Sequence, residues 1–375
     1  MNHPPYAPAA LLALALVALG CSEAPATALD AGSDTGTDVG TDAGSEDGAF
    51  VPDDTGPACA PLPIAAPRTG EGPPLGPRDG LLRVNHLQMK ATHNSYHLRP
   101  ARVIPDWDYA MAPLDVQLES QGVRGLELDL WWDARCGRFR VYHLPRLDDR
   151  STCDLFTDCL GLVRGWSDAH RDHHPLVIQL EPKETLNAAL TEARMMAMER
   201  EILAVFPREL LVTPDEVRGD AATLPEALRQ RGWPTLGQTR GRVIFVIDRT
   251  DLVRDVYTRG GTSLAGRLAF VDSRPGDPFA AVMVLNNPAH ADLSAALAAN
   301  ALVRVFAWTA GEAALDPDEA TRAFASGAHL VSTDYPGEGP DGGVGLRVPG
   351  GAVSRCNPVM APTECTATDI EPARR

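Results

Sequence analysis

Short apolar runs alternate with stretches of helical periodicity between about residues 81 and 339, and no other feature constrains the fold as strongly. Several runs are continuously apolar, which is typical of parallel strands covered on both faces. The predicted strands are Leu82–Met89, Val123–Trp131, Phe139–Leu144, Leu176–Leu180, Val243–Asp248, Ala281–Asn286, Leu302–Trp308 and His329–Ser332. The predicted helices between them are Pro113–Gln121, Asp154–His170, Asn187–Phe206, Ala291–Ala299 and Pro317–Ser326.

Eight strands that alternate with helices over this length predict an α/β fold, a (β/α)8 TIM-type barrel, possibly distorted, as a single catalytic domain. The alternative is an open doubly wound sheet, which would carry a glycine-rich phosphate turn after its first strand. No such turn follows Met89. In a barrel the reactive residues lie at the C-terminal ends of the strands, so the polar residues there are the first candidates for a functional site.

The polar residues at the ends of the first four predicted strands suit one kind of chemistry. They are His93, Asn94, Glu127, Asp129, His143, Glu181 and Lys183. Amide and carboxylate oxygens are the ligands of hard cations such as Ca²⁺, whereas zinc prefers histidine nitrogen and cysteine sulfur. Two histidines beside a cation can share the proton transfers at a phosphodiester, one as base and the other as acid.

Each of these residues also has a simpler interpretation. A histidine at a strand end is often structural. Glu127 and Asp129 alternate with leucines and therefore share one face of their strand. If that face pointed to water, the two carboxylates would only make the surface soluble. Inside a barrel they need a cation or a basic partner, and Arg124 is the candidate for a salt bridge. Lys183 either contacts a substrate phosphate or neutralises Glu181.

The N-terminal residues have the features of an export signal. Ala9–Leu19 is apolar but shorter than the about 20 residues that a membrane span needs, and Gly20-Cys21 follows it. This arrangement is typical of a secretory signal, and Cys21 stands where bacterial lipoproteins are processed and lipidated. We therefore expect residues 1–21 to be a signal peptide with a lipidated Cys21, and the protein to be an exported cell-envelope lipoprotein. Ordinary secretion and an incorrect start position remain open.

Residues 22–57 differ in composition from the rest of the chain. They contain nine acidic residues and no lysine or arginine, with glycine, serine, threonine and alanine between them. Such a segment has little apolar surface to bury, which predicts a disordered tether. It supplies −9 of the net charge of −16, and the remaining −7 is ordinary for the folded part. No basic stripe is present, so we expect no nucleic-acid partner.

Six cysteines remain after Cys21, and an even number in an exported protein predicts disulfides. Their 15 formal pairings are narrowed by short loops, which favour Cys153–Cys159 and Cys356–Cys365 and leave Cys59–Cys136. A zinc site is the alternative, but the chain has no Cys-x-x-Cys pair. We place the barrel at residues 58–340 and a disulfide-stiffened tail at residues 341–375.

Several motifs occur here in the order found in one known family. They are His93-Asn94-Ser95-Tyr96, Arg124-Gly125-Leu126-Glu127-Leu128-Asp129, Tyr142-His143, Leu176-Val177-Ile178-Gln179-Leu180-Glu181, Ser332-Thr333-Asp334-Tyr335-Pro336 and Arg355-Cys356-Asn357-Pro358. Over roughly residues 80 to 365 the chain resembles the phosphoinositide-specific phospholipases C, and most of all their bacterial calcium-dependent branch within the superfamily of related phosphodiesterases.

The resemblance implies an activity and a site. It implies calcium-dependent cleavage of phosphatidylinositol-type lipids at a membrane surface by a monomer, giving diacylglycerol and a cyclic inositol phosphate after attack by the inositol 2-hydroxyl. His93 is implied as base and His143 as acid. The implied calcium ligands are Asn94, Glu127, Asp129 and Glu181, and the implied substrate-binding residues are Lys183, Asp334, Tyr335 and Arg124.

Two other functions remain open from the sequence. A glycerophosphodiester or sphingomyelin-type phosphodiesterase would use the same barrel and a similar set of residues. A surface lipoprotein without catalysis would use the barrel to bind headgroups or sugars.

Overall fold

The computed structural model describes residues 62, 68–69, 76–184, 186–311, 316–339 and 342–371. All of them belong to the unit Cys59–Arg375. The predicted signal peptide, the lipidation site Cys21, the acidic tether and Cys59 lie outside the described residues.

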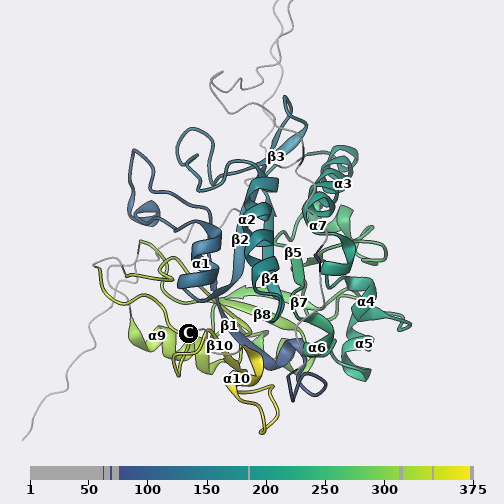
Figure 1. Ribbon diagram of the computed structural model, residues 1–375. Coiled ribbons are helices and arrows are strands. Elements are labelled where there is room, and N and C mark those ends of the chain that lie inside the picture. Colours follow the sequence, from purple (N-terminus) through teal and green to yellow (C-terminus); the bar gives the residue numbers. More distant parts are fainter. Residues whose placement is uncertain are drawn as a thin grey trace, which may run out of the picture. The chain divides into compact units, whose positions relative to one another are not determined.

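Eight strands form a nearly closed parallel barrel (Figure 1). Their order is β6–β5–β4–β2–β1–β9–β8–β7, and each hydrogen-bonded pair along this path is parallel. Asp272, directly after β6, forms an isolated parallel bridge with Val282 of β7, and this bridge links the two ends of the strand order. The strands are β1 Leu87–Thr92, β2 Val123–Asp133, β4 Leu176–Pro182, β5 Val243–Ile247, β6 Phe270–Val271, β7 Val282–Asn286, β8 Leu302–Phe306 and β9 Leu330–Thr333. The predicted (β/α)8 barrel is confirmed.

One predicted strand has a different role from the one expected. The run Phe139–Leu144 yields β3, Arg138–Val141, which pairs antiparallel with the outer half of β2 and is not a barrel strand. The missing barrel strand is β6, which has only two residues. A strand of two residues is too short to show alternation or an apolar run, so the sequence pattern could not reveal it.

Helices connect the strands and cover the outside of the barrel (Figure 1). They are α1 Leu114–Ser120, α2 Phe156–Ala169, α3 Ala188–Val205, α4 Pro214–Arg218, α5 Leu224–Gln230, α6 Leu236–Thr239, α7 Leu252–Tyr257, α8 Leu293–Ala298, α9 Pro317–Ala325 and α10 Ala367–Ile370, with the 3-10 helices η1 Val84–His86, η2 Pro105–Trp107 and η3 Arg208–Leu210. Side-chain caps explain several starts, because Asn187, Thr213 and Thr223 each accept a hydrogen bond from the first turn. Within the described ranges no helix has the length and apolarity that crossing a membrane requires.

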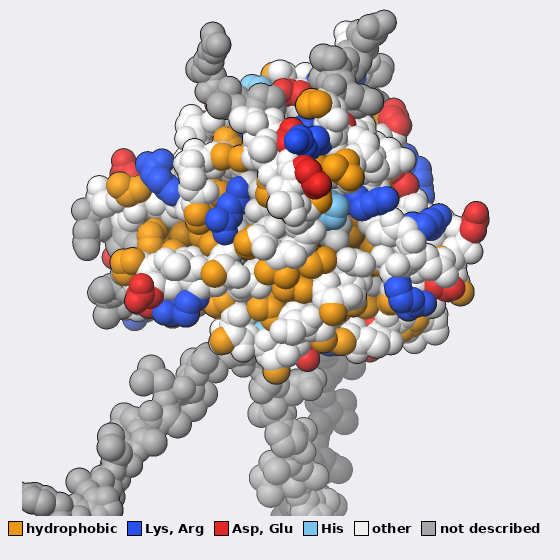
Figure 2. Space-filling view, turned by 90° about the horizontal axis from the view of Figure 1, so that it is seen from below, with side chains coloured by type: hydrophobic (Ala, Val, Ile, Leu, Met, Phe, Trp, Pro, Cys, Tyr) orange, Lys and Arg blue, Asp and Glu red, His pale blue; other side chains and the backbone are white. Residues whose placement is uncertain are grey.

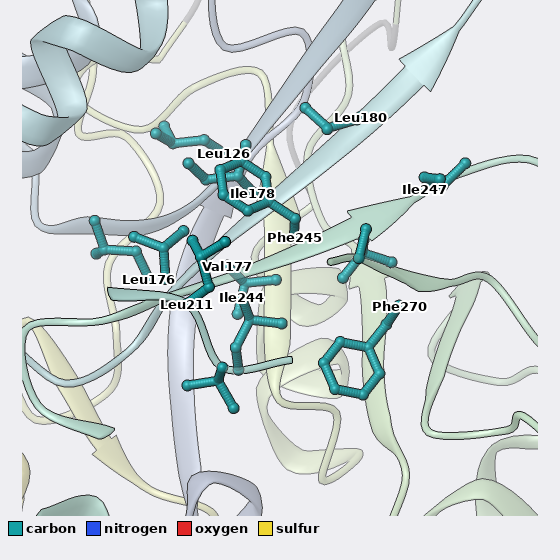
Figure 3. Packing of buried hydrophobic residues seen from close by; sticks show 14 of the residues in the cluster. Leu126, Leu176, Val177, Ile178, Leu180, Leu211, Ile244, Phe245, Ile247 and Phe270 are labelled. Atoms are coloured by element: carbon teal, nitrogen blue, oxygen red, sulfur yellow. The ribbon is translucent and has the colours of Figure 1, made fainter. Parts of the chain in front are cut away.

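The core lies in and around the central strands. Every residue of β5 is buried, and so are six of the seven in β4, which explains their continuously apolar sequences. Figure 3 shows Ile178 of β4, Phe245 of β5 and Phe270 of β6 among the side chains that pack together there.

The C-terminal segment is fastened to the N-terminal ends of the strands. Strand β10, Ser354–Cys356, pairs antiparallel with the first half of β1. Arg124, at the start of β2, is fully buried and forms a two-point ion pair with the buried carboxylate of Glu371, with a 2.8 Å hydrogen bond from Nε. Arg240 donates to the backbone oxygens of Asp369 and Ile370. Figure 2 views the molecule from below Figure 1, where hydrophobic side chains lie among scattered charged ones.

Two of the predicted disulfides are present. Cys153–Cys159 precedes and enters α2, and Cys356–Cys365 closes a loop in the C-terminal segment. Cys136 is also disulfide-bonded. Because Cys59 lies outside the described residues, the Cys59–Cys136 pairing stays a prediction.

Removing one member of the Arg124–Glu371 pair is expected to lower the free energy of unfolding by about 3–5 kcal/mol, because the other charge would stay buried without its partner. The measurement is denaturant unfolding of Arg124→Met and Glu371→Gln, followed by circular dichroism. Arg322→Met is the matched control, since its ion pair with Asp316 has side chains that are 61% and 50% exposed and is worth about 1 kcal/mol or less. If the free energy of unfolding fell by an equally small amount in the variants of both pairs, the Arg124–Glu371 pair would not hold the C-terminal segment to this end of the barrel.

Candidate active site

Three carboxylates meet near the C-terminal ends of β2 and β4. Glu127 and Asp129 face the same side of β2, and Asp129 stands directly opposite Glu181 in the β2–β4 register. Each of the three offers a carboxylate oxygen, and these oxygens lie within 4.8 Å of one another. The structure therefore brings together the three acidic residues that the sequence nominated.

The carboxylates are buried, and basic side chains offset part of their charge. Glu127 and Asp129 are buried, whereas Glu181 is partly exposed. Lys183 Nζ lies 2.9 Å from Asp129 Oδ2 and 2.8 Å from Glu181 Oε2. Arg304 of β8 donates to Glu127 Oε2 at 2.6 Å. Lys183 thus neutralises the acidic pair in this structure.

The remaining imbalance appears in the pKa of Asp129. Burial and the nearby Glu181 carboxylate raise it well above the ordinary value, and Lys183 only partly opposes them. Neighbouring carboxylates disfavour each other's charged form, most strongly where one of them is buried as Asp129 is. A divalent cation would relieve that cost, and an all-oxygen donor set fits a hard cation such as Ca²⁺ rather than zinc.

The His93–Asn94 turn is fastened directly to β2. The backbone N–H of Ser95 donates to the backbone carbonyl oxygen of Glu127 at 3.0 Å, and the Ser95 hydroxyl accepts from the backbone N–H of Glu127 at 2.8 Å. Asn94 adopts a positive φ of 40°, which asparagine tolerates better than most residues. The Tyr96 hydroxyl donates to Asn94 Oδ1 at 3.0 Å. This turn places His93 and Asn94 beside the carboxylates.

His93 stands between two acidic side chains. Its Nδ1 lies 2.9 Å from Asp334 Oδ1, and its Nε2 lies 3.8 Å from Glu127 Oε1. Burial acts to lower the pKa of His93, but Asp334 and Glu127 outweigh it, and the pKa rises to about 9. His93 is therefore an imidazolium at neutral pH in this structure, stabilised first by Asp334 and then by Glu127.

His143 reaches the same end of the barrel by a different route. Strand β3 pairs with the outer half of β2, and His143 lies in the turn that follows it. Its Nδ1 is 2.8 Å from Asp148 Oδ2, and the edge of its ring meets Trp107, with ring centroids 5.9 Å apart. The side chain is 22% exposed, so solvent reaches it.

Asp334 and Tyr335 follow β9, on the other side of His93. Asp334 Oδ2 accepts from the Ala310 N–H at 2.7 Å, so this carboxylate joins two loops. Tyr335 is buried and packs with Tyr109 and Met111. A hollow of about 520 Å³ is lined by Tyr109, Met111, Asp334 and Tyr335, together with Gln121 and other residues of the segments 108–112 and 334–339.

Arg124 does not belong to this group. It lies at the other end of β2, fully buried against Glu371 and with its guanidinium 4.6 Å from the Trp166 ring centroid. This placement contradicts the predicted substrate contact. It also contradicts the suggested salt bridge to Glu127 or Asp129, because Arg304 and Lys183 fill that role.

Sequence reasoning missed four residues near the site. Arg304 and Asp248 lie on or just after apolar strands, and a charged residue inside such a run is a signal that was available. Asp248 accepts from Gln179 at 3.1 Å, and burial followed by the charge of Glu127 raises its pKa to about 7. Asp148 and His97, which contact each other at 3.0 Å, carried no pattern that would have singled them out.

Comparison with known proteins assigns the chain to a family. The sequence matches the profile of "Phosphoinositide phospholipase C, Ca2+-dependent" over residues 138–358, which is more than half of the chain. No match was found among curated protein sequences.

The similar solved structures include enzymes from two bacteria. One is a calcium-dependent phosphoinositol-specific phospholipase C from a Pseudomonas species. Its apo form and its myo-inositol complex each share 19% identity with this chain at a TM-score of 0.54, covering 75% of this chain and 98% of the other. The other is a Ca²⁺-dependent phosphatidylinositol-specific phospholipase C from Streptomyces antibioticus, with 20% identity, a TM-score of 0.50 and coverage of 68% and 95%. These likenesses support the barrel fold, and the profile match shows that the chain belongs to the calcium-dependent phosphoinositide phospholipase C family.

Proposed function

We propose that this protein is a calcium-dependent phospholipase C that cleaves phosphatidylinositol-type lipids to diacylglycerol and a cyclic inositol phosphate. One observation carries the proposal: an all-oxygen carboxylate cluster lies beside His93, and His143 stands at the same end of the barrel. Each histidine is held at Nδ1 by its own carboxylate, which is the arrangement that a proton-transferring imidazole requires.

The chemical step uses the two histidines in opposite roles. The 2-hydroxyl oxygen of the inositol forms a bond to phosphorus, and the bond from phosphorus to the glycerol oxygen breaks. His93 accepts the proton of the attacking hydroxyl, and His143 gives a proton to the departing glycerol oxygen. Bound calcium supplies positive charge next to the phosphoryl oxygens, where negative charge gathers in the transition state.

The calcium site is assigned to Glu127, Asp129, Glu181 and Asn94. The three carboxylates fit because their oxygens already converge, and the cost of crowding them is visible in the raised pKa of Asp129. Asn94 fits because it lies on the turn that Ser95 ties to Glu127. Asp334 raises the pKa of His93 most and Glu127 next, so a cation held at Glu127 would offset one of these two charges and favour the neutral imidazole that acts as a base.

Substrate contacts are assigned to residues around this centre. Lys183, whose ammonium lies between Asp129 and Glu181, is freed to meet the phosphate when a cation replaces it between them. Asp334 orients His93 through Nδ1. Tyr335 lines the hollow beside Asp334 and would pack against the headgroup or its lipid.

Export and membrane attachment complete the proposal. Disulfides persist in oxidising compartments, and those at Cys153–Cys159 and Cys356–Cys365 support export. Residues 1–21 would act as the signal, Cys21 would carry the lipid, and the acidic segment 22–57 would let the barrel reach a phospholipid surface as a monomer.

Loss of a calcium ligand is expected to abolish turnover. In assays on phosphatidylinositol vesicles, Glu127→Gln and Asp129→Asn should each lower kcat/KM by at least about 100-fold, and chelation should do the same to the unaltered protein. Asp133→Asn is the matched control, because Asp133 lies on the same face of β2 but pairs with Arg135 and Arg140 instead. Phosphorus NMR identifies the product. Full activity in the presence of chelator, or turnover only of water-soluble diesters, would refute the proposal.

Loss of either histidine is expected to lower kcat while calcium binding persists. His93→Gln and His143→Gln should each reduce kcat by about 10²–10⁴-fold, the usual contribution of a positioned acid or base. Calcium affinity is measured in parallel by calorimetry, which separates loss of chemistry from loss of the metal site. The assignment fails if either variant keeps its rate, or if the rate falls only because calcium no longer binds.

Calcium binding is expected to release protons near neutral pH. His93 has a pKa of about 9 without a cation, so it holds a proton that a neighbouring cation would help to displace. Calorimetric titration at pH 7.5 in buffers of different ionisation enthalpy measures this release. In His93→Gln the number of released protons should fall. A heat of binding that does not depend on the buffer would contradict the coupling.

A further inference from the structure

Asp148 is a buried carboxylate shared by two histidines. Its Oδ2 lies 2.8 Å from Nδ1 of His143 and 3.0 Å from Nε2 of His97. The other carboxylate oxygen, Oδ1, is buried and has no hydrogen-bond partner among the described residues. Both imidazoles therefore compete for a single oxygen atom.

The backbone holds this carboxylate in a fixed place. Asp148 and Leu144 exchange two backbone hydrogen bonds, at 2.9 and 3.0 Å, which close the turn that carries His143. On the opposite side, His97 is held by backbone bonds to Asn94 and from Met111, both 2.8 Å. Its ring stacks on Tyr109 with centroids 4.2 Å apart. Neither side of the contact has room to rearrange easily.

The protonation of the three groups follows from this geometry. Burial acts to raise the pKa of Asp148, but the hydrogen bonds from His143 and His97 outweigh it and lower the pKa. An ionised carboxylate only accepts hydrogen bonds, so the facing ring nitrogens must carry protons. The titratable groups that face it are His143, His97 and Tyr109. In the neutral imidazole of His143 the proton is on Nδ1, and Nε2 has a free lone pair.

We propose that Asp148 is a positioning residue that fixes the orientation and tautomer of His143, and that His97 weakens this hydrogen bond by sharing the same oxygen. The inference rests on the proposed function, in which His143 exchanges a proton with the substrate. Nε2 of His143 has no hydrogen-bond partner within the described part of the chain, and the side chain is partly exposed. In the imidazolium of His143, which carries a proton on both ring nitrogens, Nε2 is thus the atom that donates to the glycerol oxygen, and the neutral imidazole that remains keeps its proton on Nδ1.

The two partners of His143 should have opposite effects on its proton transfer. Without the Asp148 charge, the imidazolium of His143 loses its main stabilising neighbour. Without His97, Asp148 serves His143 alone and stabilises the imidazolium more. A purely structural role for the cluster would instead make both losses act in the same direction, through a loosened turn.

The test compares variants of the full-length protein in pH profiles of phosphatidylinositol cleavage. Asp148→Asn should lower kcat by about 100-fold or more, because the wrong tautomer becomes available, with little change in KM, and the basic limb should move to lower pH. His97→Phe keeps the ring stacked on Tyr109 but removes the donor, and its basic limb should move to higher pH. His97→Gln retains a donor and should shift the limb less. Asp149→Asn, an exposed neighbour in the chain, is the matched control and should behave as the unaltered protein.

A second measurement does not depend on turnover. Nitrogen NMR of the labelled protein, assigned by the signals missing in His143→Gln, reports which ring nitrogen carries the proton. The expected result is a proton on Nδ1 of His143, and a mixture of tautomers in Asp148→Asn. If the lipid is not cleaved, this result still decides the role of Asp148. A neutral His143 that carries its proton on Nε2 instead of Nδ1 in the unaltered protein, an unchanged tautomer in Asp148→Asn, or limbs that move the same way in Asp148→Asn and His97→Phe would overturn the proposal. Should Asp148→Asn fail to fold, the tautomer of the unaltered protein and the His97→Phe profile decide it.

Discussion

The crowding of three carboxylates at one end of the barrel is the constraint on which the rest of the site depends. Buried like charges oppose each other's ionisation, and the structure offsets them with cationic groups from different elements. Lys183 lies between Asp129 and Glu181, Arg304 binds Glu127, and His93 faces Glu127 from a third strand. A protein keeps such a costly arrangement where a cation is to be bound, and the oxygen donors fit calcium.

The barrel keeps this arrangement in place from both ends. At the C-terminal ends of the strands, the Ser95 hydroxyl and backbone N–H tie the His93 turn to Glu127, which fixes the proposed base beside the proposed metal ligand. At the opposite end, the Arg124–Glu371 pair and β10 fasten the C-terminal segment under β1 and β2. The strand ends and the turns that follow them therefore carry the candidate site, and the C-terminal segment braces the opposite end of the barrel.

The amino-acid sequence predicted the barrel and most of the site because both leave periodic or positional signals. Continuous apolar runs marked the buried strands, and polar residues after those runs marked the strand ends. Strand β6 escaped because two residues show no period. Arg124 was misplaced because sequence proximity to Glu127 says nothing about which end of a strand faces which partner. Asp148 was not identified because its contacts with His143 and with His97, 51 residues away, form only in the folded turn, and no local pattern encodes them.

The central claim is that one calcium ion lies among Asn94, Glu127, Asp129 and Glu181, next to His93. A crystal structure of the full folded unit with calcium and a non-hydrolysable phosphonate analogue of phosphatidylinositol tests it most directly. The account predicts anomalous density for one cation between these oxygens, the Lys183 ammonium moved away from Asp129 toward the phosphonate, and both histidines within hydrogen-bond reach of the phosphorus substituents. A cation bound elsewhere, or an unmoved Lys183 with no density between the carboxylates, would contradict it.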